Sequence, residues 1–199
     1  MTFDTLDPTL DPRRAAILGA AFQTFCRYGF KRTAMDDIAR AAGLSRAGLY
    51  QHYRNKQDIF RSLTQLYFEV TTQRARQALT PALPPQVALK ALFDAKAGPE
   101  LEAMFASPHG QELLDEKFST SADIATAGIA CLAAILADWL HAEAAAGRLS
   151  LDAAGNDAPG FARTLLAAVE GLKTPDGGIA AYRRESARLA AVIGRGLRP

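Results

Sequence analysis

The sequence of 199 residues lacks the features that mark most secreted, membrane and metal-binding proteins. Its two cysteines, Cys26 and Cys131, lie far apart in apolar stretches, with no CxxC pair and no Cys/His companion at metal-ligand spacing. We interpret both as buried small hydrophobic side chains and expect no disulfide, metal or cofactor. No apolar run approaches the roughly 18 residues that cross a bilayer, and the acidic N-terminus lacks the basic-then-apolar order of a secretory signal. We therefore expect a cytoplasmic protein with no membrane partner.

Recognisable catalytic motifs are also missing. The chain has three histidines, no HExxH, no Gly-rich phosphate loop and no GxSxG, and neither cysteine has a plausible adjacent base. His109 with Glu112, and His141 with Glu143, lack a third metal ligand at a recognisable spacing. We therefore expect no enzyme. An all-helical enzyme or carrier with an incidental basic region is the alternative from another class.

The chain as a whole has little excess charge of one sign, since its net charge is only +2. Its N-terminal part, in contrast, is strongly basic. Residues 13–61 hold ten Lys or Arg against three acidic residues, a local charge of +7. Residues 62–199 hold 13 against 15, a charge of −2. This asymmetry favours a polyanionic partner for residues 13–61, and a solvated basic surface without a partner is the alternative.

Apolar residues recur at helical spacing along the chain, and no strand pattern competes with them. Capping residues and Gly/Pro punctuation delimit the predicted helices. We predict Thr33 as the N-cap of the second helix, with Asp36 three residues later. The predicted helices lie near residues 12–29, 34–43, 45–53, 55–79, 86–97, 100–106, 109–117, 121–146, 159–173 and 177–196. The sequence thus predicts an all-α fold.

The second and third predicted helices have the dimensions of a DNA-binding helix-turn-helix, with a tight turn at residues 42–44. At about 100 degrees per residue, Leu49 and Tyr53 fall on the inward side of the third helix and Ala47 and Gln51 on the outward side. The outward surface is therefore small and polar. A solvent-exposed surface helix that begins with an arginine and has no DNA-binding role is the alternative to a recognition helix.

Small and polar residues suit contact with DNA base edges. Ala47 and Gly48 carry little bulk that would hold the helix away from the groove floor. The amide of Gln51 can pair with adenine, and the fork of Arg46 can pair with guanine or a phosphate. We therefore predict that these four residues contact the bases.

The segment GFKRTAMDDIARAAGLSRAGLYQHYRNKQDIF resembles the DNA-binding signature of the TetR (tetracycline repressor) family almost position by position. The resemblance covers roughly residues 13–61. It implies a three-helix DNA-binding domain at residues 1–56, followed at residues 57–199 by a larger helical domain that binds an effector and dimerises.

The resemblance also implies which residues hold DNA phosphates: Thr33, Ser45, Tyr50, His52 and Lys56. Hydroxyl groups, helix N-termini and a lysine at the start of a helix are all suited to phosphate oxygens. Gln51 stands where the family often has an aromatic residue, which should change sequence preference. Tyr53 stands where phenylalanine is usual, which we expect to be silent packing.

Residues 123–143 predict a helix that is apolar on nearly every side, which indicates burial. Its functional interpretation is the wall of an effector cavity, and plain core is the alternative. The candidate pocket residues are Met104, Phe105, Phe118, Cys131, Ile135 and Trp139.

Apolar residues at three- and four-residue steps also follow the last two predicted helices. These could be core stripes of a monomer, but the resemblance implies a four-helix dimer interface in which Ala190 and Gly194 permit close approach. The candidate interface residues are Phe161, Leu165, Leu172, Tyr182, Ser186, Leu189 and Ile193.

Taken with the resemblance, these residues predict a homodimeric transcriptional regulator that binds an inverted repeat in double-stranded operator DNA. We expect a repressor that a small, largely apolar molecule releases from its operator. An architectural DNA-binding protein without an effector is the second alternative.

Overall fold

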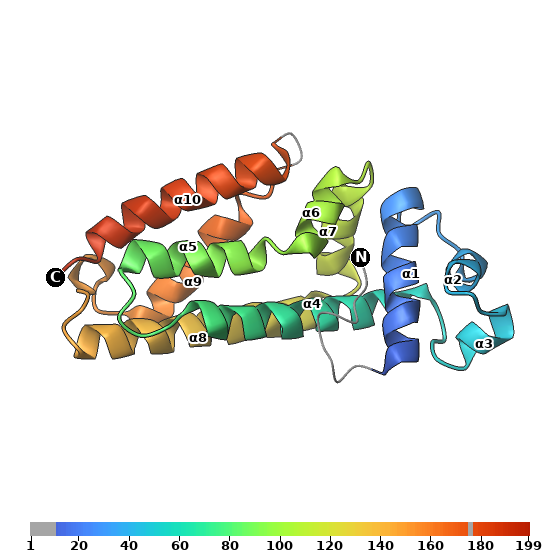
Figure 1. The fold of residues 1–199 in the computed structure, drawn as a ribbon, viewed down its shortest axis with the longest axis horizontal. Helices are drawn as coiled ribbons and strands as arrows, with labels where there is room; N and C mark the ends of the chain where they lie inside the picture. Colours follow the sequence, from blue (N-terminus) through green and yellow to red (C-terminus); the bar gives the residue numbers. More distant parts are fainter. Residues whose placement is uncertain (1–10, 175–176) are drawn as a thin grey trace. The chain divides into compact units, whose positions relative to one another are not determined.

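The computed structural model describes residues 11–174 and 177–199, apart from the side chain of Phe118. Within these residues the regular secondary structure is helical and no strand is present. The elements labelled in Figure 1 and the short 3-10 helix η2 are α1 (Pro12–Tyr28), α2 (Met35–Ala41), α3 (Arg46–Tyr50), α4 (Lys56–Ala78), α5 (Pro85–Lys96), α6 (Pro99–Ala106), α7 (Gly110–Ser119), α8 (Ala122–Ala145), η2 (Asp152–Ala154), α9 (Ala158–Glu170) and α10 (Gly178–Gly196). The predicted all-α fold and its helices are confirmed, with ends that differ by a few residues.

Local capping explains where several of these helices begin. The carboxylate of Asp11 accepts the N–H of Arg14 at 2.9 Å, and Pro12 occupies the first turn of α1. Asn55 caps α4 by accepting the N–H of Asp58 at 2.8 Å. The predicted cap of α2 is wrong by one residue: Ala34 is the N-cap, and its N–H donates to Asp37 at 2.9 Å. Because alanine has no side-chain acceptor, only half of a capping box is formed.

The described chain separates into two compact units. The first unit contains residues 11–70 and 103–126, and the second contains residues 71–102 and 127–199. These units group the residues differently from the predicted domains 1–56 and 57–199, because Leu66, Val70 and Leu113 join the core of the N-terminal helices. The predicted division into domains stays a prediction.

The first unit is built around three aromatic rings. Phe25 of α1, Phe30 of the α1–α2 turn and Phe60 of α4 have ring centroids 5.2–5.8 Å apart. Such tilted and edge-on contacts are the favoured geometry for aromatic pairs. They fix the turn that leads into α2 against the first turns of α4.

The α6–α7 segment of the first unit holds the end of α1 through polar contacts. The hydroxyl of Ser107 donates to the carbonyl of Cys26 at 2.6 Å, and the N–H of Lys31 donates to Glu112 at 2.8 Å. These bonds fix the position of backbone groups in the α1–α2 region by contacts with residues about 80 positions later in the chain.

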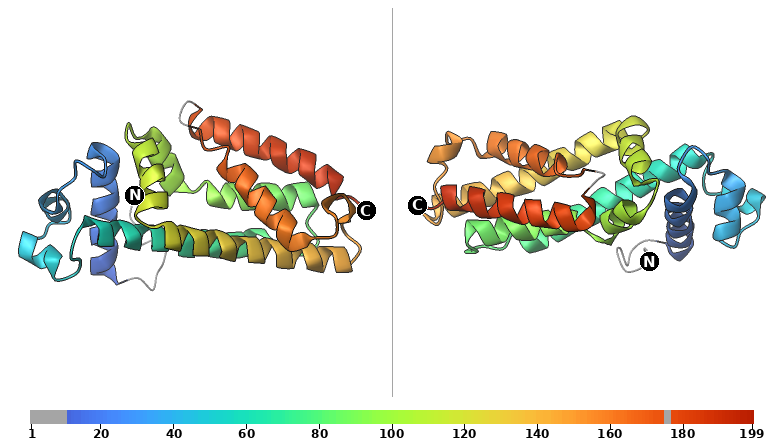
Figure 2. Two further views of the ribbon diagram at one scale, coloured as in Figure 1. Left: turned by 180° about the vertical axis from the view of Figure 1, so that it is seen from behind. Right: turned by 90° about the horizontal axis from the view of Figure 1, so that it is seen from above.

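The second unit contains a close helix pair, in which α10 lies along α5 (Figures 1 and 2). Tyr182, Ser186, Ala190 and Gly194 recur every four residues on α10 and are all buried. A Cβ atom on Gly194 would lie 2.4 Å from the backbone of Gln86, so only glycine permits this approach. The small residues of α10 therefore serve packing within the chain.

This packing corrects part of the predicted dimer interface. Leu165, Tyr182 and Ser186 expose 2% or less of their surface in the single chain, so they cannot contact a partner in this fold. Their spacing is that of a buried stripe, which a sequence cannot distinguish from an interface. The predicted residues that stay half-exposed are Phe161, Leu172, Leu189 and Ile193.

The second unit also buries charged groups in pairs. The carboxylate of Glu143, 2% exposed, accepts from Arg148 at 2.6 and 2.8 Å and from the N–H of Ala82 at 3.2 Å. The hydrogen bonds from Arg148 lower the pKa of Glu143, and burial opposes them. Glu100 pairs with Arg74 at 3.1 Å. These pairs tie helix ends and connections to one another.

By length and composition α8 could cross a membrane, but this is weak evidence because the core helices of soluble proteins pass the same test.

The two cysteines are free and half-buried, and so less enclosed than predicted. Burial raises the pKa of the Cys26 thiol to about 11, which disfavours the reactive thiolate.

Candidate DNA interface

The turn between α1 and α2 is held by the ammonium group of Lys56, at the start of α4. Its Nζ donates to the carbonyl groups of Phe30, Lys31 and Thr33 at 2.7, 2.9 and 3.0 Å. It also lies 4.8 Å from the ring centroid of Phe30. A lysine ammonium has three N–H donors, so these carbonyl groups use all of them.

The α2–α3 connection is a tight turn with a capped second helix. Gly43 has φ +66°, in the left-handed region that favours glycine. Ser45 is the N-cap of α3, and its Oγ accepts the N–H of Gly48 at 3.0 Å. The predicted serine cap is confirmed.

The two sides of α3 differ as the helical spacing predicts. Leu49 is fully buried and Tyr53 is 8% exposed, and both belong to the core of the first unit. Arg46, Ala47 and Gln51 are exposed, and Gly48 is half-buried. The residues predicted to contact bases therefore form one surface, which offers a guanidinium and an amide beside two residues with almost no side chain.

Arg46 is held across this surface by two neighbours. Its Nη1 lies 3.2 Å from Asp36 of α2, and its guanidinium lies 5.6 Å from the ring centroid of Tyr50. Its hydrogen bond with Tyr50, followed by the charge of Asp36, raises the pKa of Arg46. Both partners of the ion pair are largely exposed, so the pair is weak and a base or phosphate can displace Asp36.

Of the five predicted phosphate contacts, three lie on the exposed surface. Ser45 and His52 are exposed, and Tyr50 exposes 43% of its surface. They flank the predicted base contacts of α3 at its start and at its end. This arrangement can hold the phosphates on both sides of a helix that enters a groove.

The structure places the other two differently from the prediction. Thr33 is 2% exposed, and its hydroxyl donates inward to the carbonyl of Gly29 at 2.7 Å, so this conformation offers no hydroxyl to a phosphate. Lys56 is half-buried, with its donors bound to carbonyl groups. Both residues shape the turn before α2.

Sequence reasoning missed two kinds of residue on this surface. Asp36 was assigned only to a helix cap, yet it pairs with Arg46 ten positions later. Arg40 and Arg54 are exposed cations to which no role was given. The local charge of +7 includes both arginines, but that sum says nothing about where each side chain points.

The six predicted pocket residues do not belong to one unit. Met104 and Phe105 lie in the first unit, whereas Cys131, Ile135 and Trp139 lie in the second, and the side chain of Phe118 lies outside the described residues. Trp139 is 6% exposed, and its indole N–H donates to the carbonyl of Thr80 at 3.1 Å. That bond ties α8 to the α4–α5 connection, as expected of a core tryptophan.

The helix-turn-helix matches a family model described as "Bacterial regulatory proteins, tetR family" over residues 17–63. The HTH-type transcriptional regulator YhgD of Bacillus subtilis (strain 168) is 32% identical over 72 residues, which are 36% of this chain and 38% of YhgD. The chain thus spans less than two fifths of the length of the first curated relatives that it matches.

Solved structures resemble the whole chain in fold. A TetR-family regulator from Mesorhizobium loti has a TM-score of 0.71 at 16% identity, over 94% of this chain and 97% of that one. SmeT, the repressor of a multidrug efflux pump of Stenotrophomonas maltophilia, has a TM-score of 0.67 at 19% identity, over 94% and 90% of the two chains. SmeT has also been solved as a complex with triclosan. The curated relatives are transcriptional regulators. Residues 17–63 thus match the DNA-binding segment of the TetR family of bacterial regulatory proteins, and the chain has the fold of solved TetR-type structures.

Proposed function

We propose that this protein regulates transcription by binding operator DNA through α3, and that it catalyses no reaction. The observation that carries the proposal is the exposed surface of α3, on which Arg46, Ala47, Gly48 and Gln51 lie above the buried Leu49. A recognition helix needs this combination of a fixed inner side and an outer side that fits a groove.

Arg46 and Gln51 are the side chains able to read bases by paired hydrogen bonds, whereas Ser45, Tyr50 and His52 position the helix on the backbone. Since residues 13–61 carry a charge of +7, the attraction to DNA should weaken as salt rises. The matched family consists of bacterial regulatory proteins, and bacterial DNA lies in the cytoplasm, so we infer that the protein acts there.

The test is to select bound fragments from genomic DNA and to measure affinity for the enriched duplex and for a scrambled one. Arg46→Ala or Gln51→Ala should lose about 1–3 kcal/mol of discrimination, since each removes a bidentate base contact. Gln23→Ala and Arg76→Ala, on exposed positions of α1 and α4, are the matched controls. Affinity that is insensitive to salt, or discrimination unchanged in both α3 variants, would contradict the proposal.

We further propose that the protein is a homodimer and binds an inverted repeat, because two identical DNA-binding units related by a dyad meet related half-sites. The interface would use the outer sides of α9 and α10, where Phe161, Leu172, Leu189 and Ile193 are half-exposed and Val192 is 61% exposed. Leu189→Asp should give monomers, because it buries an unpaired carboxylate in an apolar seam. Sedimentation at micromolar concentration measures the outcome, and a wild-type monomer would refute the dimer.

The regulatory step that we propose is release of a repressor by a small, largely apolar ligand bound within residues 86–172. Support comes from the apolar α8 and from SmeT, a repressor of the same fold that has been solved with triclosan. Linkage requires that bound DNA weaken ligand affinity by the factor by which ligand weakens DNA affinity. Titrating triclosan with and without the selected duplex measures the effect of DNA on ligand affinity, and titrating the duplex with and without triclosan measures the reverse effect. Equal triclosan affinity in the two cases would contradict the proposed regulation.

An architectural protein without an effector is the competing function. Thermal-shift measurements against a library of apolar compounds separate the two, since a ligand selective for the folded state raises the melting temperature.

A further inference from the structure

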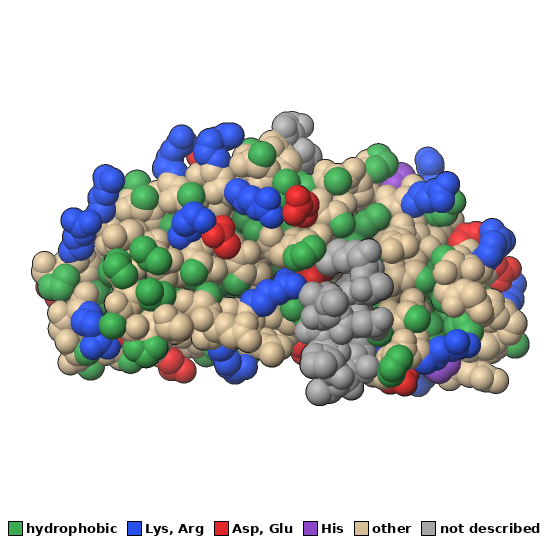
Figure 3. Space-filling view, in the orientation of Figure 1, with side chains coloured by type: hydrophobic (Ala, Val, Ile, Leu, Met, Phe, Trp, Pro, Cys, Tyr) green, Lys and Arg blue, Asp and Glu red, His purple; other side chains and the backbone are tan. Residues whose placement is uncertain are grey.

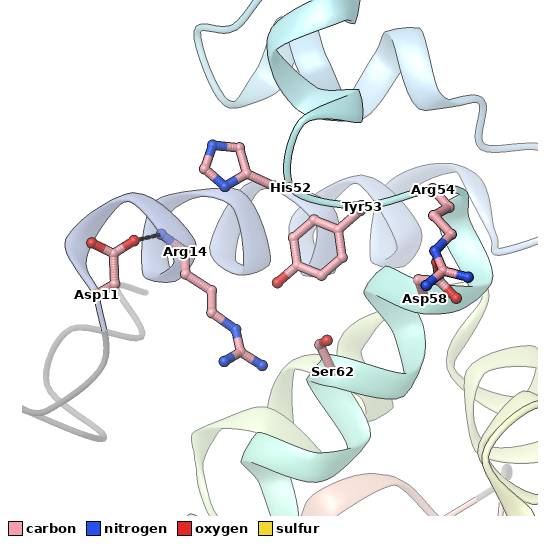
Figure 4. A pocket seen from close by; sticks show the side chains of 7 residues that line it. All are labelled: Asp11, Arg14, His52, Tyr53, Arg54, Asp58 and Ser62. Carbon is pink, nitrogen blue, oxygen red and sulfur yellow. Dashed lines mark hydrogen bonds between the residues drawn. The ribbon is translucent and has the colours of Figure 1, made fainter.

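A pocket of about 470 Å³ lies in the first unit, next to the predicted phosphate contact His52 (Figure 4). It is formed by the start of α1, the α3–α4 connection and the first turns of α4. Seven residues line it: Asp11, Arg14, His52, Tyr53, Arg54, Asp58 and Ser62. Its volume is many times the roughly 30 Å³ that one water molecule occupies in the liquid.

The hydroxyl of Tyr53 is the feature of this pocket that packing does not explain. Its oxygen is buried and has no hydrogen-bond partner among the described residues. Figure 4 shows this hydroxyl, the guanidinium of Arg14 and the hydroxyl of Ser62 directed toward the same space. A buried polar group without a partner is costly, and a ligand that accepts its hydrogen bond removes the cost. The ring of Tyr53 packs in the core, as the sequence predicted, but the hydroxyl that distinguishes it from phenylalanine has no partner there.

The other polar groups of the pocket favour an acceptor-rich guest. In the described part of the chain, no carboxylate lies within the 4.0 Å of an ion pair from the guanidinium of Arg14 or Arg54. Asp11 and Asp58 balance the charge of the two arginines, and Asp11 is already engaged by the N–H of Arg14. Recognition would thus come from directed N–H and O–H donors. A singly charged oxyanion with free oxygens satisfies such donors without adding a large charge.

We propose that this pocket binds one phosphate-type oxyanion, with Arg14 and the Tyr53 hydroxyl as its principal donors. The group is either a phosphodiester of the DNA backbone next to His52 or a free phosphate. The first source rests on the proposed DNA-binding function, whereas the second does not.

Tyr53→Phe is the sharpest test, because it deletes one oxygen and keeps the ring that packs in the core. Without ligand, its melting temperature should equal or exceed that of the wild type, since the lost hydroxyl has no partner in the protein. Affinity for a mixed-sequence duplex should fall about tenfold, as expected for a lost hydrogen bond to a charged acceptor. A merely structural hydroxyl would lower the melting temperature instead.

Arg14→Gln tests the charge. It should lower the slope of log affinity against log salt by about 0.9, the contribution of one neutralised phosphate. Arg13→Gln is the matched control, because Arg13 is the exposed neighbour that does not line the pocket. In a second arm, the melting temperatures of the wild type and both pocket variants are compared in sodium phosphate and in sodium chloride of equal ionic strength.

Weaker duplex binding in both pocket variants, with no phosphate effect, would identify the DNA backbone as the source. A phosphate-dependent rise in melting temperature that both variants lose would identify free phosphate. If neither arm distinguishes the variants from the wild type, the site binds no oxyanion. If the wild type binds no duplex at all, the proposed function fails, and the phosphate arm alone decides the site.

Discussion

The two units of this protein use charged side chains in opposite ways. On the α2–α3 surface of the first unit, Arg40 and Arg46 are exposed, and the ion pair that Arg46 makes is open to solvent. In the second unit Lys96 and Glu143 are each 2% exposed and engage Glu170 and Arg148. Exposed cations remain available to a partner, whereas buried pairs hold the helices of their own unit.

The outer side of α10 qualifies this contrast. Arg183, Arg184, Arg188 and Arg195 are exposed there, and Figure 3 shows Lys and Arg side chains gathered over this helix. Glu102 and Glu185 pair with three of these arginines, and Arg195 stands outside those pairs. Surface charge alone therefore does not identify a DNA-binding surface. What distinguishes α3, the proposed DNA-binding helix, is the combination of charge, small residues and a capped, buried inner side.

The largest expected effect lies in the second unit, at Trp139. Trp139→Ala should lower the free energy of unfolding by about 3–5 kcal/mol, because it empties a buried site and removes the bond to Thr80. Urea denaturation measures the change. Trp139→Phe keeps most of the apolar volume and should cost less. If the Trp139→Ala protein is as stable as the wild type and only its ligand affinity has changed, Trp139 lines the effector pocket as the sequence predicted.

The close approach of α10 to α5 predicts the next effect. Gly194→Ala should lower the free energy of unfolding by about 1–3 kcal/mol, because its Cβ would overlap the backbone of Gln86. Gly196→Ala is the control, since no atom lies within 4 Å of the added methyl group. Thermal unfolding of both variants is the measurement, and equal melting temperatures would contradict the packing argument.

Lys56 sharpens the comparison, because it is a cation of the first unit whose donors are turned inward. Lys56→Met should lower the unfolding free energy by about 1–2 kcal/mol, since it leaves three carbonyl groups without their donor. DNA affinity should fall with an unchanged salt slope. Lys31→Met, at an exposed neighbouring position, should leave stability unchanged. A slope reduced by one phosphate in Lys56→Met would restore the predicted phosphate contact.

The smallest effect is expected at Asp36, the exposed partner of Arg46. Asp36→Asn should change stability by no more than about 0.2–1 kcal/mol, the range of surface ion pairs. It should raise DNA affinity a few-fold, because it frees Arg46 and removes a negative charge from the proposed DNA-binding surface. Asp37→Asn is the contrasting variant, because Asp37 does not pair with Arg46 but accepts the N–H of Ala34 at the start of α2. Lower DNA affinity in Asp36→Asn would mean that the pair positions Arg46 for binding.

Much of the fold was predictable because helices depend on neighbours three or four residues away. The cap at Ser45 and the inward positions of Leu49 and Tyr53 follow from local spacing alone. The cap of α2 was misplaced because Thr33 offers a hydroxyl at a suitable position, but the fold directs that hydroxyl to Gly29. Local rules propose a partner, and the tertiary structure selects among the partners available.

The stripes of α9 and α10 show the same limit at larger scale. Spacing predicts that Leu165, Tyr182 and Ser186 lie on an inward side, and all three are buried. Whether the opposing surface belongs to the same chain or to a second copy depends on residues nearly 100 positions away, such as Gln86. No local pattern contains that information.

By itself, the sequence determined the helices, the helix-turn-helix and the surface that α3 presents, because each follows from short-range periodicity and from a signature in one continuous segment. Only the tertiary structure decided that Lys56 holds the α1–α2 turn, that Asp36 holds Arg46 and that Gly194 admits α5. It also decided that the Tyr53 hydroxyl lies without a partner at the edge of a pocket. In each case the deciding contact joins residues on different elements of the fold, and the energy of a polar or close-packed group depends on the partner that the folded chain brings to it.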